Sequence, residues 1–275
     1  MFGMKSRWLI IPAITLGLSV TGCESSHIAK AASAPGSALQ PVGTKTGTSH
    51  RSAAATVSLK SYVTSARSPD LVVNISYPAL EGMASRRVEE GVNSIIFNSV
   101  TRYVSDFETS LKGETGVIPP GTGGTADSQS EITGSFTKEL LDSRYASFKF
   151  AITTYFAGAA SPTTQARSLT FDLSNGKLLQ LADLFSGSNY LPTLSSRSKA
   201  AVEAKLGQNA DQSLIDFGTQ PNAVNFANWN LTKKGLELTF SQGQVGAGAA
   251  GMVSIILPYS GFAQIANSPG PLTNP

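Results

Sequence analysis

The sequence predicts an α+β fold with a mainly antiparallel sheet packed by one long and one shorter helix. Apolar residues change between strand and helix spacing in the order strand, long helix, strands, helix, strands. Turn signals of hairpins join most of the strands. Strands and helices do not alternate regularly, as they would in a parallel, doubly wound sheet.

A strand and a long helix open the folded part. Apolar and polar side chains alternate from Leu71 to Tyr77, and Pro78 ends the strand. Apolar residues then recur every three or four positions from about Ser85 to Lys112, which predicts an amphipathic helix that stops at Gly113. The expected buried stripe is Val88, Val92, Ile95, Ser99, Tyr103, Phe107 and Leu111, widened by Ile96, Val100 and Val104.

A hairpin and a third strand follow a loop rich in Gly, Pro and Thr that ends near Ser128. The two arms are Glu131–Leu141 and Arg144–Phe156, joined by a turn at Asp142-Ser143. A third strand over Ser168–Leu173 runs into a turn at Asn175-Gly176. In the second arm we expect Phe148, Phe150, Ile152 and Phe156 on one face, and Ser147, Lys149, Thr153 and Tyr155 on the other.

The C-terminal part contains a shorter helix and late strands. The helix covers Tyr190–Leu206 and stops at Gly207, and a brief helical piece follows at Gln212–Phe217. Pro and Asn are frequent after residue 265, so we expect residues 266–275 to be disordered. The late strands are predicted at Phe226–Leu231, Leu236–Phe240 and Met252–Pro258.

The N-terminus has the features of an export signal. Two early bases precede an apolar run over Trp8–Val20 that is shorter than the about 20 residues that span a bilayer. Val20-Thr21-Gly22-Cys23 resembles the lipobox of bacterial lipoproteins, which implies cleavage before Cys23 and a lipid on its sulfur. We therefore expect a signal peptide over 1–22, a flexible tether over 23–59 and an extracytoplasmic, membrane-anchored protein.

Composition excludes several classes of function. Only 14% of the chain is charged, and the net charge of +3 is too small for a nucleic-acid-binding face. One cysteine cannot form an internal disulfide or a Cys-rich metal site. Both histidines, His27 and His50, fall in the tether, so the folded part lacks the imidazole of Ser–His or Cys–His catalysis and of zinc hydrolases. We expect no enzyme, no metal and no cofactor.

Two further patterns in the sequence are candidate sites. Gly246–Gly251 has the letters of a dinucleotide fingerprint, but a strand pattern follows it where the fingerprint requires a helix. A carboxylate pair for glycoside hydrolysis is still open, although no spacing marks two partners. The acids near ordered segments are Glu139, Asp172, Asp183, Asp216 and Glu237. Asp172, beside Asn175-Gly176, more simply hydrogen-bonds its own turn.

A series of short motifs between about residues 70 and 262 resembles one domain family. The series includes Tyr155–Pro162, Ser168–Leu173, Leu181–Phe185, Leu231–Leu236, Gln244–Gly251 and Leu257-Pro258-Tyr259. In order and spacing these resemble the extracytoplasmic domain of the RsiV-type anti-sigma factor, which also accompanies polysaccharide deacetylases of the PdaC type. We divide the folded chain into an N-terminal part, 60–150, and a part resembling this ectodomain, 151–265.

The resemblance implies sensing or binding. In the anti-sigma factor the domain binds lysozyme, and in the deacetylase it is not the catalytic part. Many relatives read Gly-Gly-Ala-His-Gly where this chain has Gly158–Pro162, so Ser161 stands at the histidine position and puts any role of that imidazole in doubt.

We therefore expect a monomeric, non-catalytic binding protein, anchored through Cys23, whose ligand is lysozyme, peptidoglycan or a related envelope component. Gly-rich turns lie next to aromatic residues in this sequence, and loops often bind ligands. The same turns are equally consistent with plain connections between strands. The candidate binding residues are Tyr155, Phe156, Ser161, Pro162, Gln244 and Gly246. A carbohydrate-active hydrolase using two carboxylates and a structural lipoprotein without a ligand are the alternatives.

Overall fold

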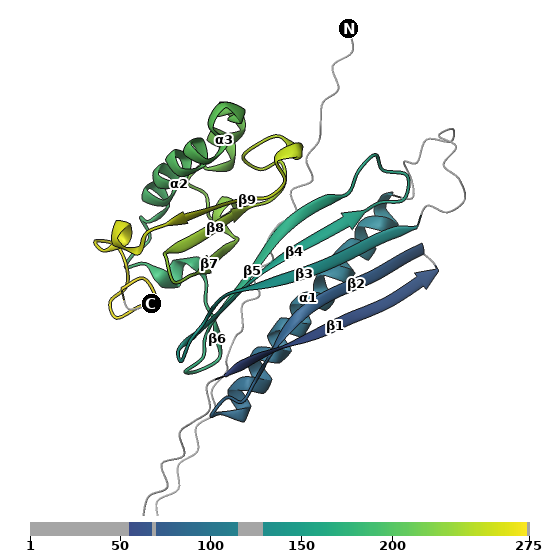
Figure 1. Ribbon diagram of the computed structural model, residues 1–275, viewed down its shortest axis with the longest axis horizontal. Coiled ribbons are helices and arrows are strands. Elements are labelled where there is room, and N and C mark those ends of the chain that lie inside the picture. Colours follow the sequence, from purple (N-terminus) through teal and green to yellow (C-terminus); the bar gives the residue numbers. More distant parts are fainter. Residues whose placement is uncertain (1–54, 68–69, 115–128, 274–275) are drawn as a thin grey trace, which may run out of the picture. The chain divides into compact units, whose positions relative to one another are not determined.

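The computed structural model describes residues 55–67, 70–114 and 129–273 (Figure 1). The predicted signal peptide, Cys23, both histidines and most of the loop before Ser128 lie outside these residues. Within the described ranges, no helix is both long and apolar enough to cross a membrane. The elements are β1 Thr56–Arg67, β2 Asp70–Glu81, α1 Arg86–Glu114, β3 Ser130–Leu141, β4 Tyr145–Tyr155, β5 Thr163–Asp172, β6 Lys177–Leu178, α2 Leu191–Leu206, α3 Gln212–Gly218, β7 Trp229–Leu231, β8 Leu236–Phe240 and β9 Val253–Leu257.

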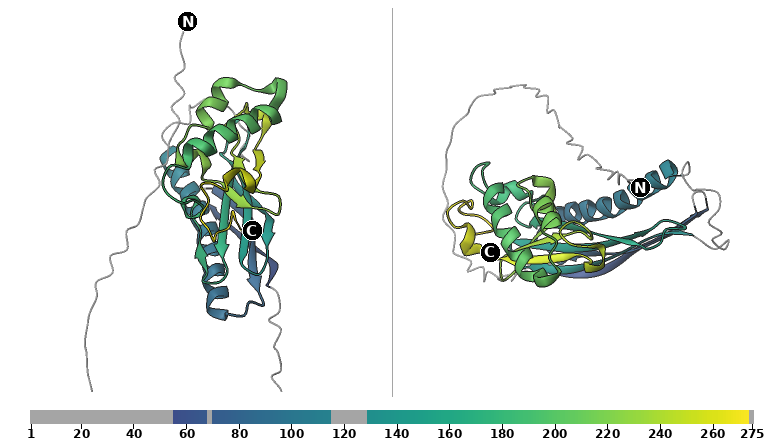
Figure 2. Two further views of the ribbon diagram at one scale, coloured as in Figure 1. Left: turned by 90° about the vertical axis from the view of Figure 1, so that its left-hand side faces the viewer. Right: turned by 90° about the horizontal axis from the view of Figure 1, so that it is seen from above.

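Strands β1 to β6 form a six-stranded sheet in sequence order. Neighbours pair antiparallel except β2 and β3, which are parallel from Leu71↔Ser130 to Ile75↔Gly134. A parallel pair needs a long crossover between its strands, and α1 occurs in that connection. Helix α1 lies along one face of the sheet (Figure 2). The predicted α+β class with a mainly antiparallel sheet is confirmed.

The first core lies between α1 and this sheet. Phe148, Phe150 and Ile152 of β4 are buried there on one face, as the alternation predicts. On α1 the buried line is Val92, Ile96, Val100, Val104, Phe107 and Leu111. Four predicted stripe residues, Val88, Ile95, Ser99 and Tyr103, are only half-buried. The residues expected to widen the stripe thus lie at its centre, because the direction of helix packing is set by the sheet and not by the helix pattern.

A second layer consists of a three-stranded antiparallel sheet, β7-β8-β9, with α2 and α3. Its core contains Leu194 and Val202 of α2, Ile215 of α3, and Leu238 and Phe240 of β8. The predicted helices and late strands are confirmed, except that Phe226 belongs to a short 3-10 turn before β7. Strands β7 and β8 contact β4 and β5 of the larger sheet. Ser147 and Lys149, which alternate with the core residues of β4, make these contacts.

Strand β1 was not expected from the sequence. It begins at Thr56, inside the range predicted as tether, and pairs with β2 over its whole length from Thr56↔Glu81 to Arg67↔Asp70. The strand carries many Ser and Thr residues, and its Leu59 and Val63 are exposed. Pairing with β2 therefore forms this strand, and its own apolar pattern does not reveal it.

The prediction of a disordered tail is wrong for residues 266–273. Ala266 bridges to Phe185, and Leu272 is only 3% exposed. The Asn267 amide donates to the carbonyl oxygen of Asp183 at 2.8 Å. Proline and asparagine lower the tendency to form helices and strands, but tertiary contacts order this segment without either.

Candidate functional site

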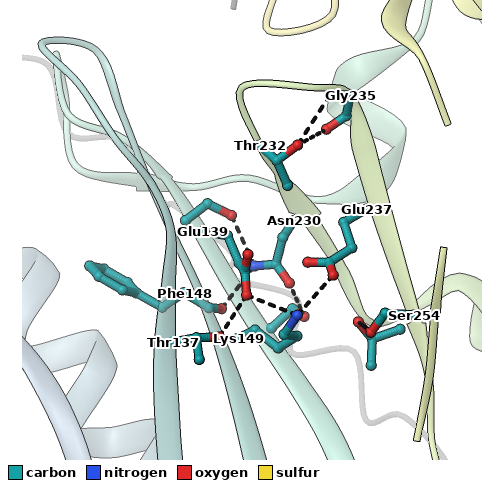
Figure 3. A network of polar contacts seen from close by, with 12 residues as sticks. Thr137, Glu139, Phe148, Lys149, Asn230, Thr232, Gly235, Glu237 and Ser254 are labelled. Carbon is teal, nitrogen blue, oxygen red and sulfur yellow. Dashed lines mark hydrogen bonds and ion pairs between the residues drawn. The ribbon is translucent and has the colours of Figure 1, made fainter. Parts of the chain in front are cut away.

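Two of the five candidate carboxylates meet at a single lysine between the two sheets (Figure 3). Lys149 Nζ on β4 lies 2.8 Å from Glu139 Oε1 on β3 and 2.8 Å from Glu237 Oε1 on β8. The three side chains are 18%, 19% and 9% exposed, respectively. Thr137 also donates a hydrogen bond to Glu139 at 2.6 Å. This cluster, the Lys149 ion link, joins the six-stranded sheet to the three-stranded sheet.

The pKa values of the Lys149 ion link favour its charged form. Burial by itself raises the pKa of Glu139, but hydrogen bonds from Lys149 and Thr137 and the Lys149 charge outweigh it and hold this pKa below the ordinary value. Burial also opposes the charge of Lys149, yet the two carboxylates raise the pKa of Lys149 above its ordinary value. A general acid needs a carboxyl group that keeps its proton near neutral pH. Glu139 has the opposite tendency, so the geometry is that of an ionic contact between layers.

The other three acids have local partners. Asp172 accepts hydrogen bonds from the backbone and hydroxyl of Ser174, as expected for a turn residue. Asp183 pairs with Lys177 at 2.8 Å, and Asp216 pairs with Lys199. Within the described ranges no group of three or more His, Cys, Asp or Glu residues could hold a metal ion.

A buried amide network lies beside the Lys149 ion link. Asn230 of β7 is 0% exposed and donates to Ser147 Oγ and to the Phe148 carbonyl, each at 2.9 Å. Ser168 of β5 donates to Asn230 Oδ1 at 2.8 Å, and Ser147 and Thr170 share a hydrogen bond of 2.7 Å. A buried polar network stabilises a unique arrangement when its members find partners, as these do.

The open part of the larger sheet, on the face away from α1, carries a polar groove. Two adjoining cavities of about 300 and 260 Å³ share Thr133 and Thr153. Their lining comes from β2, β3 and β4 and from the turn after β4. We call this surface the sheet groove, and its lining residues are Asn74, Ser76, Glu131, Thr133, Gly134, Ser135, Ala151, Thr153, Tyr155 and Pro162.

The groove side chains Asn74, Ser76, Thr133 and Ser135 have no hydrogen-bond partner in the described part of the chain. Thr153 bonds Thr164 of β5 at 2.9 Å. Hydroxyl and amide groups both donate and accept hydrogen bonds. Ala151 is small and leaves space between the polar rows. The groove therefore offers a row of unused donors and acceptors with Tyr155 at one end.

The structure brings some predicted binding residues to the groove and not others. Tyr155 and Pro162 line it. Phe156 turns to the other face of the sheet and packs on Phe107 of α1, with ring centroids 4.9 Å apart. Ser161 is exposed in the turn between β4 and β5.

Gln244 and Gly246 have structural surroundings. Gln244 accepts a hydrogen bond from the backbone of Ser241 and donates to the Asn225 carbonyl, each at 3.0 Å. Gly246 is buried against Leu206 of α2. Gly248–Ala250 form a short 3-10 turn, and β9 follows where a dinucleotide site would need a helix.

The turn that contains Gln244 nevertheless contacts the start of β5. Thr164 N donates to Gln242 Oε1 at 2.9 Å, and Ala166 N donates to Ser241 Oγ at 3.1 Å. The groove residues Asn74, Ser76, Thr133 and Ser135 were missed by sequence reasoning. Their signal was the polar half of each alternating strand, which the sequence shows but does not distinguish from an ordinary solvent-facing row.

Fold and groove together define an α+β domain with an open, polar sheet face and an ion link between its two layers. Residues 182–260 match the model of the DUF3298 family, described as a protein of unknown function. The matched residues include α2, α3 and the three-stranded sheet, and the sheet groove lies outside them.

Three known proteins are similar to this chain in sequence or in fold. The chain is 29% identical over 106 residues to the peptidoglycan-N-acetylmuramic acid deacetylase PdaC of Bacillus subtilis, a match over 38% of this chain and 23% of the deacetylase. A DUF3298 family crystal structure from Bacteroides fragilis aligns with a TM-score of 0.54 and 16% identity, over 78% of this chain and 93% of that one. One from Pseudomonas aeruginosa aligns with a TM-score of 0.50 and 12% identity, over 79% and 95%. These solved structures support the fold.

Proposed function

We propose that this chain is a lipid-anchored, extracytoplasmic binding protein that takes a peptidoglycan glycan strand in the sheet groove without cleaving it. The observation that carries the proposal is the row of unpartnered Asn74, Ser76, Thr133 and Ser135 side chains across three neighbouring strands.

The chemistry of the groove suits a sugar chain. Sugars present many hydroxyl groups, each of which both donates and accepts hydrogen bonds. A row of Ser, Thr and Asn side chains can accept hydrogen bonds from these hydroxyls and donate hydrogen bonds to them. Tyr155 adds an aromatic body with a polar end, which suits a ring that is apolar on its faces and polar at its rim. An open groove along a sheet admits an extended polymer, whereas a closed pocket admits only its end.

The partial match to a peptidoglycan deacetylase supports a ligand of this class, because a domain accompanying such an enzyme encounters the same polymer. The lipobox at Cys23 would place the groove on the side of the membrane where peptidoglycan lies. A lysozyme ligand rests on the resemblance alone. That protein is basic, and Glu131 is the one acid among the groove residues.

Binding to purified peptidoglycan sacculi tests the proposal. The full chain is incubated with sacculi, and the bound fraction is measured against concentration. The double variant Asn74→Ala/Thr133→Val removes two groove partners and should weaken binding at least about tenfold, since each hydrogen bond contributes roughly 1 kcal/mol. Thr64→Val is the matched control, because Thr64 is an exposed β1 residue outside the groove.

Sacculi that retain none of the wild-type chain would overturn the proposal, as would equal retention of the double variant and wild type. A parallel incubation with immobilised lysozyme distinguishes the other ligand. Release of reducing ends from the sacculi would favour the hydrolase.

A further inference from the structure

A separate cavity of about 510 Å³ lies where β4 begins and β5 ends. Its volume falls in the range of small-molecule sites, about 300–1,000 Å³. It shares no lining residue with the sheet groove. The lining residues that matter here are Arg144, Asp172, Asn175, Lys177 and Asp183, with the backbone of 267–271 as one wall.

The wall formed by the C-terminal segment is fixed in place. Asn267 donates from its backbone to the Leu184 carbonyl at 3.0 Å and from its amide to the Asp183 carbonyl at 2.8 Å. Gly270 N donates to Thr273 Oγ1 at 3.1 Å, and the neighbouring Leu272 is buried. The cavity is therefore formed before any ligand arrives, which lowers the entropy cost of binding.

One pair of charges in the cavity is already satisfied. Lys177 Nζ lies 2.8 Å from Asp183 Oδ1, and Asp183 Oδ2 accepts from Gln180 N at 2.7 Å. The ammonium and the carboxylate neutralise each other. The recognition of a charged ligand would then depend on the other two charged groups.

Those two groups, Arg144 and Asp172, are not paired. The Arg144 guanidinium lies over the Tyr145 ring, 5.1 Å from its centroid, and forms no ion pair or side-chain hydrogen bond within the described ranges. Asp172 uses one carboxylate oxygen for Ser174, and its other oxygen has no partner there.

Arg144 lies in the turn before β4, and Asp172 is the last residue of β5. Asp172 is the register partner of Tyr145, and Leu173 N donates to the Arg144 carbonyl at 2.6 Å. Both side chains line the cavity, and no ion pair joins them within the described ranges. A ligand with one carboxylate and one ammonium would satisfy both.

We propose that this cavity binds a small zwitterion of the amino-acid class, an amino acid or short peptide. Arg144 takes its carboxylate, as a planar guanidinium favours, and Asp172 takes its ammonium. The side-chain oxygen of Asn175 already accepts a hydrogen bond from Lys177 N. The side-chain amide nitrogen of Asn175 is left to donate to a ligand carbonyl. With two cations and two carboxylates the lining is formally neutral, which disfavours a phosphate or other polyanion.

Calorimetric titration of the full chain with alanine, alanyl-alanine and tetra-alanine tests this inference. Comparing the three probes shows whether the cavity prefers an amino acid or a peptide. At least one of these probes should bind. The same probe with an acetylated amino end or an amidated carboxyl end should bind at least about tenfold more weakly, because each change removes a charge-assisted hydrogen bond. These blocked probes use the wild-type chain, so their result does not depend on how a variant folds.

Arg144→Gln and Asp172→Asn should each weaken the best probe by a similar factor, and Asn at 172 can still accept from Ser174. Arg197→Gln is the matched control, because Arg197 also lies over an aromatic ring, 5.8 Å from the Phe262 centroid, but outside the cavity. Asn74→Ala/Thr133→Val should leave this binding unchanged, which keeps it distinct from the proposed glycan site.

Three results would overturn the inference. The first is that no zwitterionic probe binds at millimolar concentration. The second is that blocked and free probes bind equally. The third is that Arg197→Gln weakens binding as much as Arg144→Gln, in folded samples with equal thermal unfolding profiles.

Discussion

Lys149 Nζ of β4 and Glu237 Oε1 of β8 lie 2.8 Å apart and join the two sheets through side chains that are 18% and 9% exposed. The two residues are 88 positions apart in the chain. Glu139 completes the contact from β3, so a single ammonium holds two carboxylates. Glu237 Oε2 is buried and has no hydrogen-bond partner among the residues that the structure describes, which makes Lys149 the main compensation for this carboxylate.

Replacing Lys149 with methionine should destabilise the protein by about 3 kcal/mol, because it leaves two largely buried carboxylates without a counter-charge. Urea unfolding at neutral pH measures the change. Lys60→Met is the control, since its pair with Glu81 is 3.5 Å long and about half exposed, and it should have little effect. Adding Glu139→Gln and Glu237→Gln to Lys149→Met should recover part of the loss. Equal effects of Lys149→Met and Lys60→Met would contradict the structural role of the ion link.

The ion link should also make stability depend on pH in the acid range. The pKa of Glu139 is lower in the folded chain than its ordinary value of 4.5, so the unfolded state binds more protons in this range. The contribution of Glu139 is fully present above pH 4.5 and is lost as pH falls through the lowered folded pKa. The difference in unfolding free energy between wild type and Glu139→Gln should therefore shrink as the pH falls below 4.5. A difference that is the same at neutral and acid pH would count against this mechanism.

Gly134 of β3 should not tolerate a side chain. A Cβ atom there would lie 2.7 Å from Ile75 Cγ2 and 2.9 Å from Ile152 Cδ1. Gly134→Ala should cost about 1–3 kcal/mol through overpacking, and Ile75→Val should relieve part of it. Gly91→Ala in α1 is the matched control, because its Cβ would meet nothing within 4 Å, and it should stabilise the helix by up to about 1 kcal/mol. Thermal unfolding of both variants measures these changes in stability. If Gly134→Ala leaves the stability unchanged, the two isoleucines can move to accommodate the methyl group.

The C-terminal segment should contribute to stability. Leu272 is 3% exposed, so Leu272→Ala should cost about 2–3 kcal/mol through lost burial and a cavity. Leu59→Ala is the comparison, because Leu59 is 67% exposed on β1 and its loss should change stability by less than about 0.5 kcal/mol. Denaturant unfolding measures both. Equal, small effects would mean that residues after Ala266 do not pack in solution.

Cys23 should anchor the chain. Cys23→Ser should move the protein from the membrane fraction to the soluble fraction, because two acyl chains hold a protein at a bilayer. Without the acyl chains only the uncleaved apolar run over Trp8–Val20 is left, and it is shorter than a bilayer-spanning helix. Fractionation and mass spectrometry of the N-terminus measure the change. Globomycin should cause the precursor to accumulate in the wild type. Signal-peptide cleavage that is unchanged by globomycin and by Cys23→Ser would contradict lipidation.

Local features of the fold could be predicted from the sequence. Alternation located β2 and β4, and a repeat of three to four residues located α1. The turns at Asp142 and Gly176 also formed where predicted, with Asp142 Oδ1 accepting from the backbone of Arg144 and Tyr145, and with Gly176 at φ +78. These elements are encoded by neighbouring residues, so a short window of sequence contains the relevant information.

The candidate sites could be predicted only in part. Tyr155 and Pro162 were named from the sequence and line the groove, whereas Phe156 faces the other core and Gln244 bonds its own layer. Strand β1 was missed because it lacks an apolar row. The tail was missed because its order comes from contacts with residues 183–185, far away in the chain.

The sequence by itself determined most of the elements, their order and the predicted export signal, because periodicity, turn residues and short motifs act over a few neighbouring positions. The tertiary structure decided which polar residues meet. Glu139, Lys149 and Glu237 carry no common spacing, yet strand pairing and sheet packing bring them within hydrogen-bond distance. Arg144 and Asp172 likewise line one cavity only because β4 pairs with β5. Contacts between distant residues depend on register and layer packing, which are properties of the whole fold.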